Sequence, residues 1–140
     1  MITKNNEYIN NDHICFIRNI ISLEKGYDKR AYPEYSIFSN KKYYIPVPDL
    51  SGINILPFYR INDTIPSIAT CGYPTKSKID YYINLKHISL ILPNVWKQQG
   101  LPDSNSVLDS FEIHFFSGCS LIIYNVTSLE KLYEELENGD

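Results

Sequence analysis

The sequence predicts an α+β fold: a mainly antiparallel sheet of about five to seven strands with an N-terminal helix and a C-terminal helix packed on it. Three observations predict this fold. The chain has 140 residues, which suits a single domain spanning residues 1–140. It contains twelve tyrosines and many isoleucines, and aromatic and β-branched side chains favour strands. One segment near each end combines helix-capping residues with a helical spacing of apolar side chains.

The N-terminal helix is expected at residues 12–25. Asn11 or Asp12 can cap its first turn by accepting a hydrogen bond from a backbone N–H group. Its apolar side chains recur at helical spacing and form one broad face: Ile14, Phe16, Ile17, Ile20 and Ile21. Gly26 can adopt the left-handed conformation that ends a helix. Because isoleucine has only moderate helix propensity, a strand over part of this segment stays open as an alternative.

Residues 27–76 are expected to form short strands and loops, because prolines recur in this stretch and each removes a backbone donor. Tyr35–Ser39 and Lys42–Val47 flank Asn40-Lys41, and this pattern predicts a hairpin. Two further short strands are expected at Asn54–Ile61 and Pro66–Cys71.

Apolar and polar residues alternate clearly from Ile79 onward. Apolar side chains take every second position through Leu85, and the alternation resumes on a shifted register at Ile88. The pattern predicts half-buried strand segments with a bend near His87. The polar stretch Pro93–Asp109 is expected to be a long loop or a broken helix.

A second hairpin is expected close to the C-terminus. Phe111–Phe116 and Cys119–Asn125 flank Ser117-Gly118, a dipeptide typical of tight turns between strands.

The final helix is expected at residues 127–138. Thr127 and Glu130 have the spacing of a capping box, in which the hydroxyl and the carboxylate each accept a backbone N–H bond. The apolar stripe of this helix recurs at helical spacing: Leu129, Leu132, Tyr133 and Leu136. Gly139 marks its end.

Composition and charge exclude several classes of protein. The net charge of −3 at pH 7 is not the basic footprint of a nucleic-acid-binding protein. Lysines and tyrosines do gather between residues 25 and 44, but Glu24, Asp28 and Glu34 cancel much of that charge. The polar N-terminus lacks the apolar segment of a signal peptide, and no apolar run is long enough to span a membrane. We therefore expect a cytoplasmic protein with no membrane contact and no nucleic-acid partner.

The cysteine pattern agrees with a reducing compartment. The chain has three cysteines, an odd number, and their wide spacing contains no Cys-x-x-Cys motif. Cys15, Cys71 and Cys119 are therefore expected to be reduced and mainly buried.

Motifs for catalysis and for cofactor binding are absent. The sequence has no Gly-x-Ser-x-Gly elbow and no glycine-rich phosphate loop. His13 and Cys15 are the only close pair of metal-ligand types, and on a helix their side chains would diverge. We therefore expect no catalytic residue, no metal and no cofactor.

One acid–base cluster is an alternative to this view. Glu112 and His114 lie two residues apart on an expected strand, so they face the same side. With His87 from a neighbouring strand they could form a cluster that cleaves RNA, because imidazoles exchange protons near neutral pH. The simpler interpretation is that they are ordinary outward-facing residues.

The C-terminal segment, residues 127–140, is acidic. It holds five acidic residues and one lysine, a local charge of −4. The segment is either a solvated helix face or an acidic surface for a basic partner.

In its size, its composition and its plan of helices on an antiparallel sheet, the chain resembles bacterial immunity proteins. These include the immunity proteins of contact-dependent growth inhibition and of polymorphic toxin systems. The resemblance implies a non-enzymatic inhibitor that binds the catalytic domain of a cognate toxin, expected to be a nuclease, and occludes its active site. It implies contact through the acidic helix and exposed aromatic residues: Glu130, Glu134, Glu135, Glu137, Tyr43, Tyr44 and Trp96. Three alternatives stay open: a phage-encoded inhibitor of a host defence protein, the small RNA-cleaving enzyme, and a regulatory sheet domain that binds nucleic acid.

Overall fold

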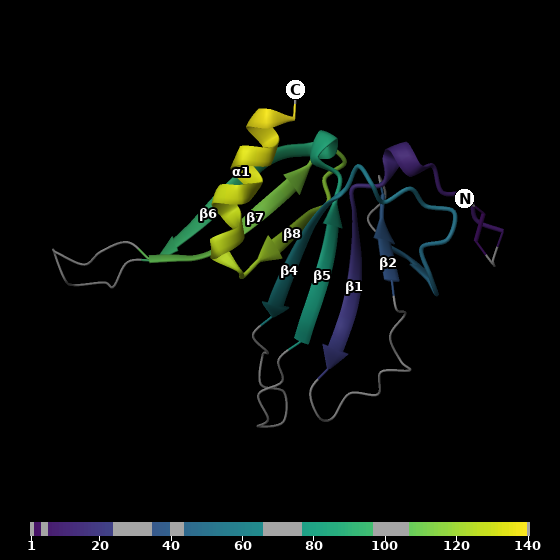
Figure 1. The fold of residues 1–140 in the computed structure, drawn as a ribbon, viewed down its shortest axis with the longest axis horizontal. Helices are drawn as coiled ribbons and strands as arrows, with labels where there is room; N and C mark the ends of the chain where they lie inside the picture. Colours follow the sequence, from purple (N-terminus) through teal and green to yellow (C-terminus); the bar gives the residue numbers. More distant parts are fainter. Residues whose placement is uncertain are drawn as a thin grey trace, which may run out of the picture.

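The computed structural model describes residues 2–3, 6–23, 35–39, 44–65, 77–96 and 107–139. Within these ranges the chain forms eight strands in two antiparallel sheets, followed by the α-helix α1 near the C-terminus (Figure 1). The expected antiparallel sheet is confirmed, whereas the strands are more numerous than expected and divide between two sheets.

The large sheet has five strands, and each neighbouring pair is antiparallel. In spatial order they are β3 (Tyr44–Val47), β2 (Tyr35–Phe38), β1 (Phe16–Leu23), β5 (Ser77–Ile83) and β4 (Tyr59–Ile65). The predicted hairpin of β2 and β3 is confirmed by its register, in which Tyr35 lies opposite Val47. Its turn residues Asn40 and Lys41 lie outside the described residues, as does the strand expected at Pro66–Cys71.

The N-terminal helix expected at residues 12–25 is wrong, because β1 occupies most of this segment. A short 3-10 helix, η1 (Asn11–His13), precedes the strand, and the Asn10 side chain caps it by accepting from the Asp12 N–H group. β1 lies in the middle of the large sheet and is buried on both faces: Phe16 and Ile17, on opposite faces, are 3% and 0% exposed. From Ile14 to Ile17 the chain is apolar and buried at every position, as in a strand covered on both faces. Ile14, Ile17 and Ile21 also fit a helical spacing, so the sequence pattern alone does not separate the two structures.

The small sheet has three strands, β6 (Ile88–Trp96), β7 (Val107–Phe115) and β8 (Ser120–Ile123). The predicted bend at His87 is the 3-10 helix η3 (Leu85–His87), which connects β5 of the large sheet to β6 of the small sheet. The loop or helix expected over Pro93–Asp109 is wrong at both ends, where β6 and β7 continue as paired strands. The hairpin at Ser117-Gly118 is confirmed, and Gly118 has the φ of +94° that this turn requires.

Two apolar clusters form the core. The first joins the two sheets and α1: Cys15, Phe16, Ile61, Ile79, Tyr81, Ile83, Phe111, Ile113, Phe115, Leu121, Ile123, Leu129 and Leu132. The second lies on the opposite face of the large sheet: Ile9, Ile14, Ile17, Ile37, Val47 and Ile53. The Phe16 and Phe115 rings stack across the sheet-to-sheet contact with centroids 5.3 Å apart. The large sheet is therefore the middle layer of the fold.

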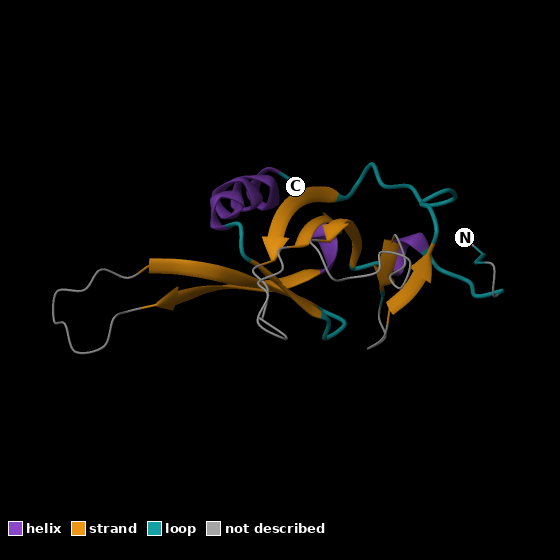
Figure 2. Cartoon of the chain, turned by 90° about the horizontal axis from the view of Figure 1, so that it is seen from below, coloured by secondary structure: helices purple, strands orange, loops and turns teal. Residues whose placement is uncertain are grey.

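The C-terminal helix is confirmed as α1 (Leu129–Asn138), preceded by the 3-10 turn η4 (Val126–Ser128). Leu129 and Leu132 bury its apolar side, whereas Tyr133 is 39% exposed. The predicted capping box does not form, because the Thr127 hydroxyl donates to Asn125 Oδ1 instead. In Figure 2, α1 lies to one side of the small sheet.

Candidate protein-binding surface

The outer side of α1 is a row of exposed carboxylates. Glu130, Glu134, Glu135 and Glu137 are all exposed, and Lys131 is the one basic residue of the helix. None of the four glutamates has a hydrogen bond or ion pair with another described residue. The spacing of Glu130, Glu134 and Glu137 puts them in one line along the helix, and Glu135 lies beside this line. We call these four glutamates the acidic row.

The acidic row lies beside the β4 edge of the large sheet. Tyr59 of β4 packs against the same apolar cluster as Leu136 of α1. The pKa of Tyr59 is raised, first by burial and then by the negative charges of Glu135 and Glu134. The negative charges of Glu134 and Glu135 therefore reach Tyr59 of β4. The buried leucines Leu129 and Leu132 hold the helix in this position.

The aromatic candidates do not join this surface. Tyr44 is 43% exposed on β3, the strand at the opposite edge of the large sheet from β4. Its ring lies 5.6 Å from the Phe38 ring and 5.8 Å from the Arg18 guanidinium carbon. Tyr43 lies outside the described residues, and only the backbone of Trp96 is described, paired with Val107. Of the expected interface residues that the structure describes, the glutamates thus lie on α1 and Tyr44 lies on β3, at the far edge of the large sheet.

The structure brings together two members of the expected acid–base cluster. His114 Nε2 lies 3.7 Å from Glu112 Oε1 on β7, and both side chains are about one-third exposed. His87 lies in η3, where its Nε2 is 2.6 Å from the carbonyl oxygen of Asp12. The His87 ring is therefore engaged with the N-terminal segment rather than with the pair on β7.

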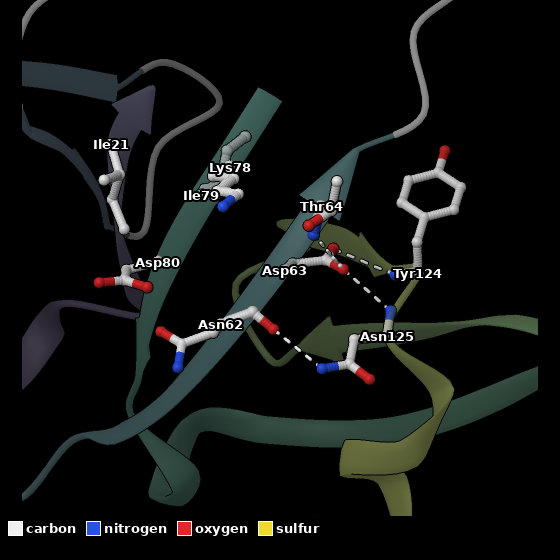
Figure 3. A pocket seen from close by; sticks show the side chains of 9 residues that line it. All are labelled: Ile21, Asn62, Asp63, Thr64, Lys78, Ile79, Asp80, Tyr124 and Asn125. Atoms are coloured by element: carbon white, nitrogen blue, oxygen red, sulfur yellow. Dashed lines mark hydrogen bonds between the residues drawn. The ribbon is translucent and has the colours of Figure 1, made fainter. Parts of the chain in front are cut away.

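A cavity of about 530 Å³ opens beside β4 and β5 (Figure 3). Polar side chains and two apolar ones line it: Ile21, Asn62, Asp63, Thr64, Lys78, Ile79, Asp80, Tyr124 and Asn125. No sequence motif predicts this cavity, because Asp63 and Asp80 resemble ordinary polar positions on alternating strands. Both are in fact buried, at 4% and 1% exposure.

Asp63 and one oxygen of Asp80 already have partners. Asp63 Oδ2 accepts from the Tyr124 N–H group at 3.1 Å and Asp63 Oδ1 from the Asn125 N–H group at 2.9 Å (Figure 3). Asp80 Oδ2 forms an ion pair with Arg60, and this contact raises the pKa of the exposed guanidinium. The other oxygen, Asp80 Oδ1, is buried and has no hydrogen-bond partner among the described residues. Asp63 and Asp80 Oδ2 therefore connect separate segments of the chain.

Among the described residues, no group of three or more His, Cys, Asp or Glu side chains is placed to hold a metal ion. No helix in the described part of the chain has both the length and the apolar character needed to cross a membrane. Comparison with family models, with curated proteins and with solved structures finds no match for this chain. The geometry of its own residues is therefore the basis for any assignment.

Proposed function

We propose that this chain is an inhibitor of the immunity-protein type, which binds a basic toxin domain, a nuclease, and covers its active site without catalysis. The observation that carries the proposal is the acidic row on α1: four exposed carboxylates without partners among the described residues, on a helix fixed by Leu129 and Leu132.

Electrostatics supports a basic partner. A nuclease must attract phosphate groups, so its substrate site carries basic side chains. A line of carboxylates presents negative charge to such a site as a nucleic-acid backbone does. Long-range attraction between the two raises the association rate, and salt weakens it. Such an inhibitor acts in the cytoplasm, where the nuclease would otherwise reach its substrate.

A charge reversal on α1 tests this proposal. Glu134→Lys is expected to slow association with the toxin domain encoded by the adjacent upstream gene by about fivefold at low ionic strength, and by less as salt screens the charges. The measurement is the association rate by surface plasmon resonance across a salt series, together with protection of cells that express the toxin.

Asp12→Lys is the matched control. It makes the same change of charge at an exposed residue of η1, a helix separate from α1 that lies near β2 (Figure 1). Equal association rates for the two variants would contradict a binding role for the acidic row. A phage-encoded inhibitor of a host defence protein would use the same surface, and the neighbouring genes distinguish it from an immunity protein.

A further inference from the structure

Cys15 lies where three parts of the fold meet. It directly precedes β1 and is 0% exposed. Its N–H group donates to the Phe38 carbonyl at the end of β2, at 2.8 Å, and its carbonyl accepts from the Asn84 N–H group at 2.9 Å. The backbone at Cys15 is therefore hydrogen-bonded to β2 on one side and to the residue after β5 on the other.

The β7–β8 turn brings a second thiol to the same place. Cys15 Sγ lies 3.3 Å from Ser117 Oγ, and the same hydroxyl oxygen accepts from the Cys119 N–H group at 3.4 Å. The Cys119 thiol donates to the Ser39 carbonyl at 3.3 Å. Ser39 is the residue after Phe38, to which Cys15 is bonded. Both cysteines thus contact Ser117, and they also contact two consecutive residues, Phe38 at the end of β2 and Ser39 directly after it.

From this arrangement we propose that Cys15 and Cys119 are a redox-modification site, a dithiol that oxidised glutathione converts into an intramolecular disulfide. The bond would connect the start of β1 in the large sheet to the β7–β8 turn of the small sheet. Both sulfurs belong to segments already held together by hydrogen bonds, and both cysteines contact the Ser117 hydroxyl, which keeps the two thiols near each other.

The reaction has two exchange steps. Cys119 is partly exposed, so its thiolate attacks one sulfur of oxidised glutathione and releases one glutathione thiolate, which leaves a mixed disulfide on Cys119. The Cys15 thiol then passes its proton to solvent through the partly exposed Ser117 hydroxyl that it contacts. Its thiolate attacks Cys119 Sγ, and the second glutathione thiolate leaves and takes up a proton. In total the two protein thiols give up two electrons and two protons, and one oxidised glutathione becomes two reduced molecules.

The second step depends on pH. Burial raises the pKa of Cys15, the nearby Cys119 raises it further, and the Ser117 hydroxyl lowers it. At neutral pH little of Cys15 is thiolate, so ring closure is expected to be slow and to accelerate as the pH rises.

Intact-mass spectrometry of the full chain after incubation with oxidised glutathione tests the proposal. We expect a loss of about 2 Da, with peptide mapping that joins Cys15 to Cys119. The same product is expected from Cys71→Ser, which removes the third cysteine. The disulfide closes a loop of about 100 residues and should raise the thermal midpoint by about 10 °C.

Single-cysteine variants distinguish the role of Cys119, which reacts first with glutathione, from that of Cys15, which closes the disulfide. Cys15→Ala should accumulate the glutathione adduct on Cys119, whereas Cys119→Ala should gain no adduct on the buried Cys15. A disulfide to Cys71, stable separate adducts on Cys15 and Cys119, or no reaction of the Cys71→Ser chain would each overturn the proposal. The Cys71→Ser result keeps both proposed cysteines, so it does not depend on whether the alanine variants fold.

Discussion

Single buried polar side chains connect segments that lie far apart in this sequence. Asn84 Nδ2 donates to the Ile14 carbonyl at 3.0 Å and connects the end of β5 to the residue before Cys15. Asp63 receives two backbone N–H groups from the segment after β8. In each case a side chain satisfies backbone groups that no strand pairing reaches, and unsatisfied buried groups are costly.

Tyr81 gives a prediction at this scale for alkaline pH. It is 5% exposed, and burial, with smaller contributions from Asp63 and Tyr124, raises its pKa to about 12 despite the opposing effect of Arg18. In the unfolded chain the pKa of tyrosine is about 10. The unfolded state therefore loses this proton first, so the stabilisation is complete below about pH 10 and is lost as the pH rises toward 12.

Tyr81→Phe should reduce this alkaline loss of stability. The measurement is the free energy of unfolding from urea titrations between about pH 8 and about pH 11.5. Tyr133→Phe, at an exposed position of α1, is the matched control and should keep the loss seen in the parent chain. An identical pH dependence of Tyr81→Phe and the parent would contradict this assignment.

At the scale of elements, the sequence predicts the structures that depend on neighbouring residues and misses those that depend on distant strand pairing. The β7–β8 hairpin and α1 are encoded by a turn dipeptide and by helical spacing, which act within a few residues. The helix predicted over residues 12–25 is wrong, because the burial of β1 depends on strands far away in the sequence. The same limit applies to residues 93–96, whose strand pairing is with β7.

Two isoleucines of β1 differ in how distant strands cover them. Ile17 and Ile21 are four residues apart, a spacing that shares one face on a helix and on a regular strand, yet Ile17 is 0% and Ile21 is 44% exposed. The pairing of β1 with β5 shifts its register between Ile20 and Ser22, next to Ile21. Ile17→Ala should lower the free energy of unfolding by about 2–4 kcal/mol, because it leaves a cavity in the second core cluster. Ile21→Ala should cost less than about 1 kcal/mol. Chemical denaturation measures both, and similar costs for the two variants would contradict this difference in burial.

At the scale of the whole molecule, the two sheets and α1 depend on one shared apolar cluster and on a few polar connections. Leu129 and Leu132 of α1 pack in the cluster that Phe16 of the large sheet and Phe115 of the small sheet also form. The acidic row therefore keeps its position relative to β4 only while the sheets stay together. A binding surface on α1 thus depends on the whole fold.

Asp63 provides the test at this scale, because it ties β4 to the residues that lead into α1. Asp63→Ala leaves the N–H groups of Tyr124 and Asn125 without this acceptor and should cost about 3 kcal/mol. Hydrogen exchange should show faster exchange in α1 as well as in β4. Asp109→Ala, at an exposed position of β7, is the control and should change stability by under about 0.5 kcal/mol. Faster hydrogen exchange in β4 alone would show that the stability of α1 does not depend on Asp63.

The sequence by itself determined the antiparallel character, the two hairpins, the C-terminal helix and the acidic charge of its outer side. Each of these follows from neighbouring residues, through turn preference, strand or helix spacing, and charge. Only the tertiary structure decided that β1 is a central strand, that the His87 ring contacts Asp12 rather than His114, and that Asp80 is buried. It also separated Tyr44 from the acidic row and brought Cys15 to Cys119. These outcomes depend on which distant strands pair, and no local preference encodes that pairing.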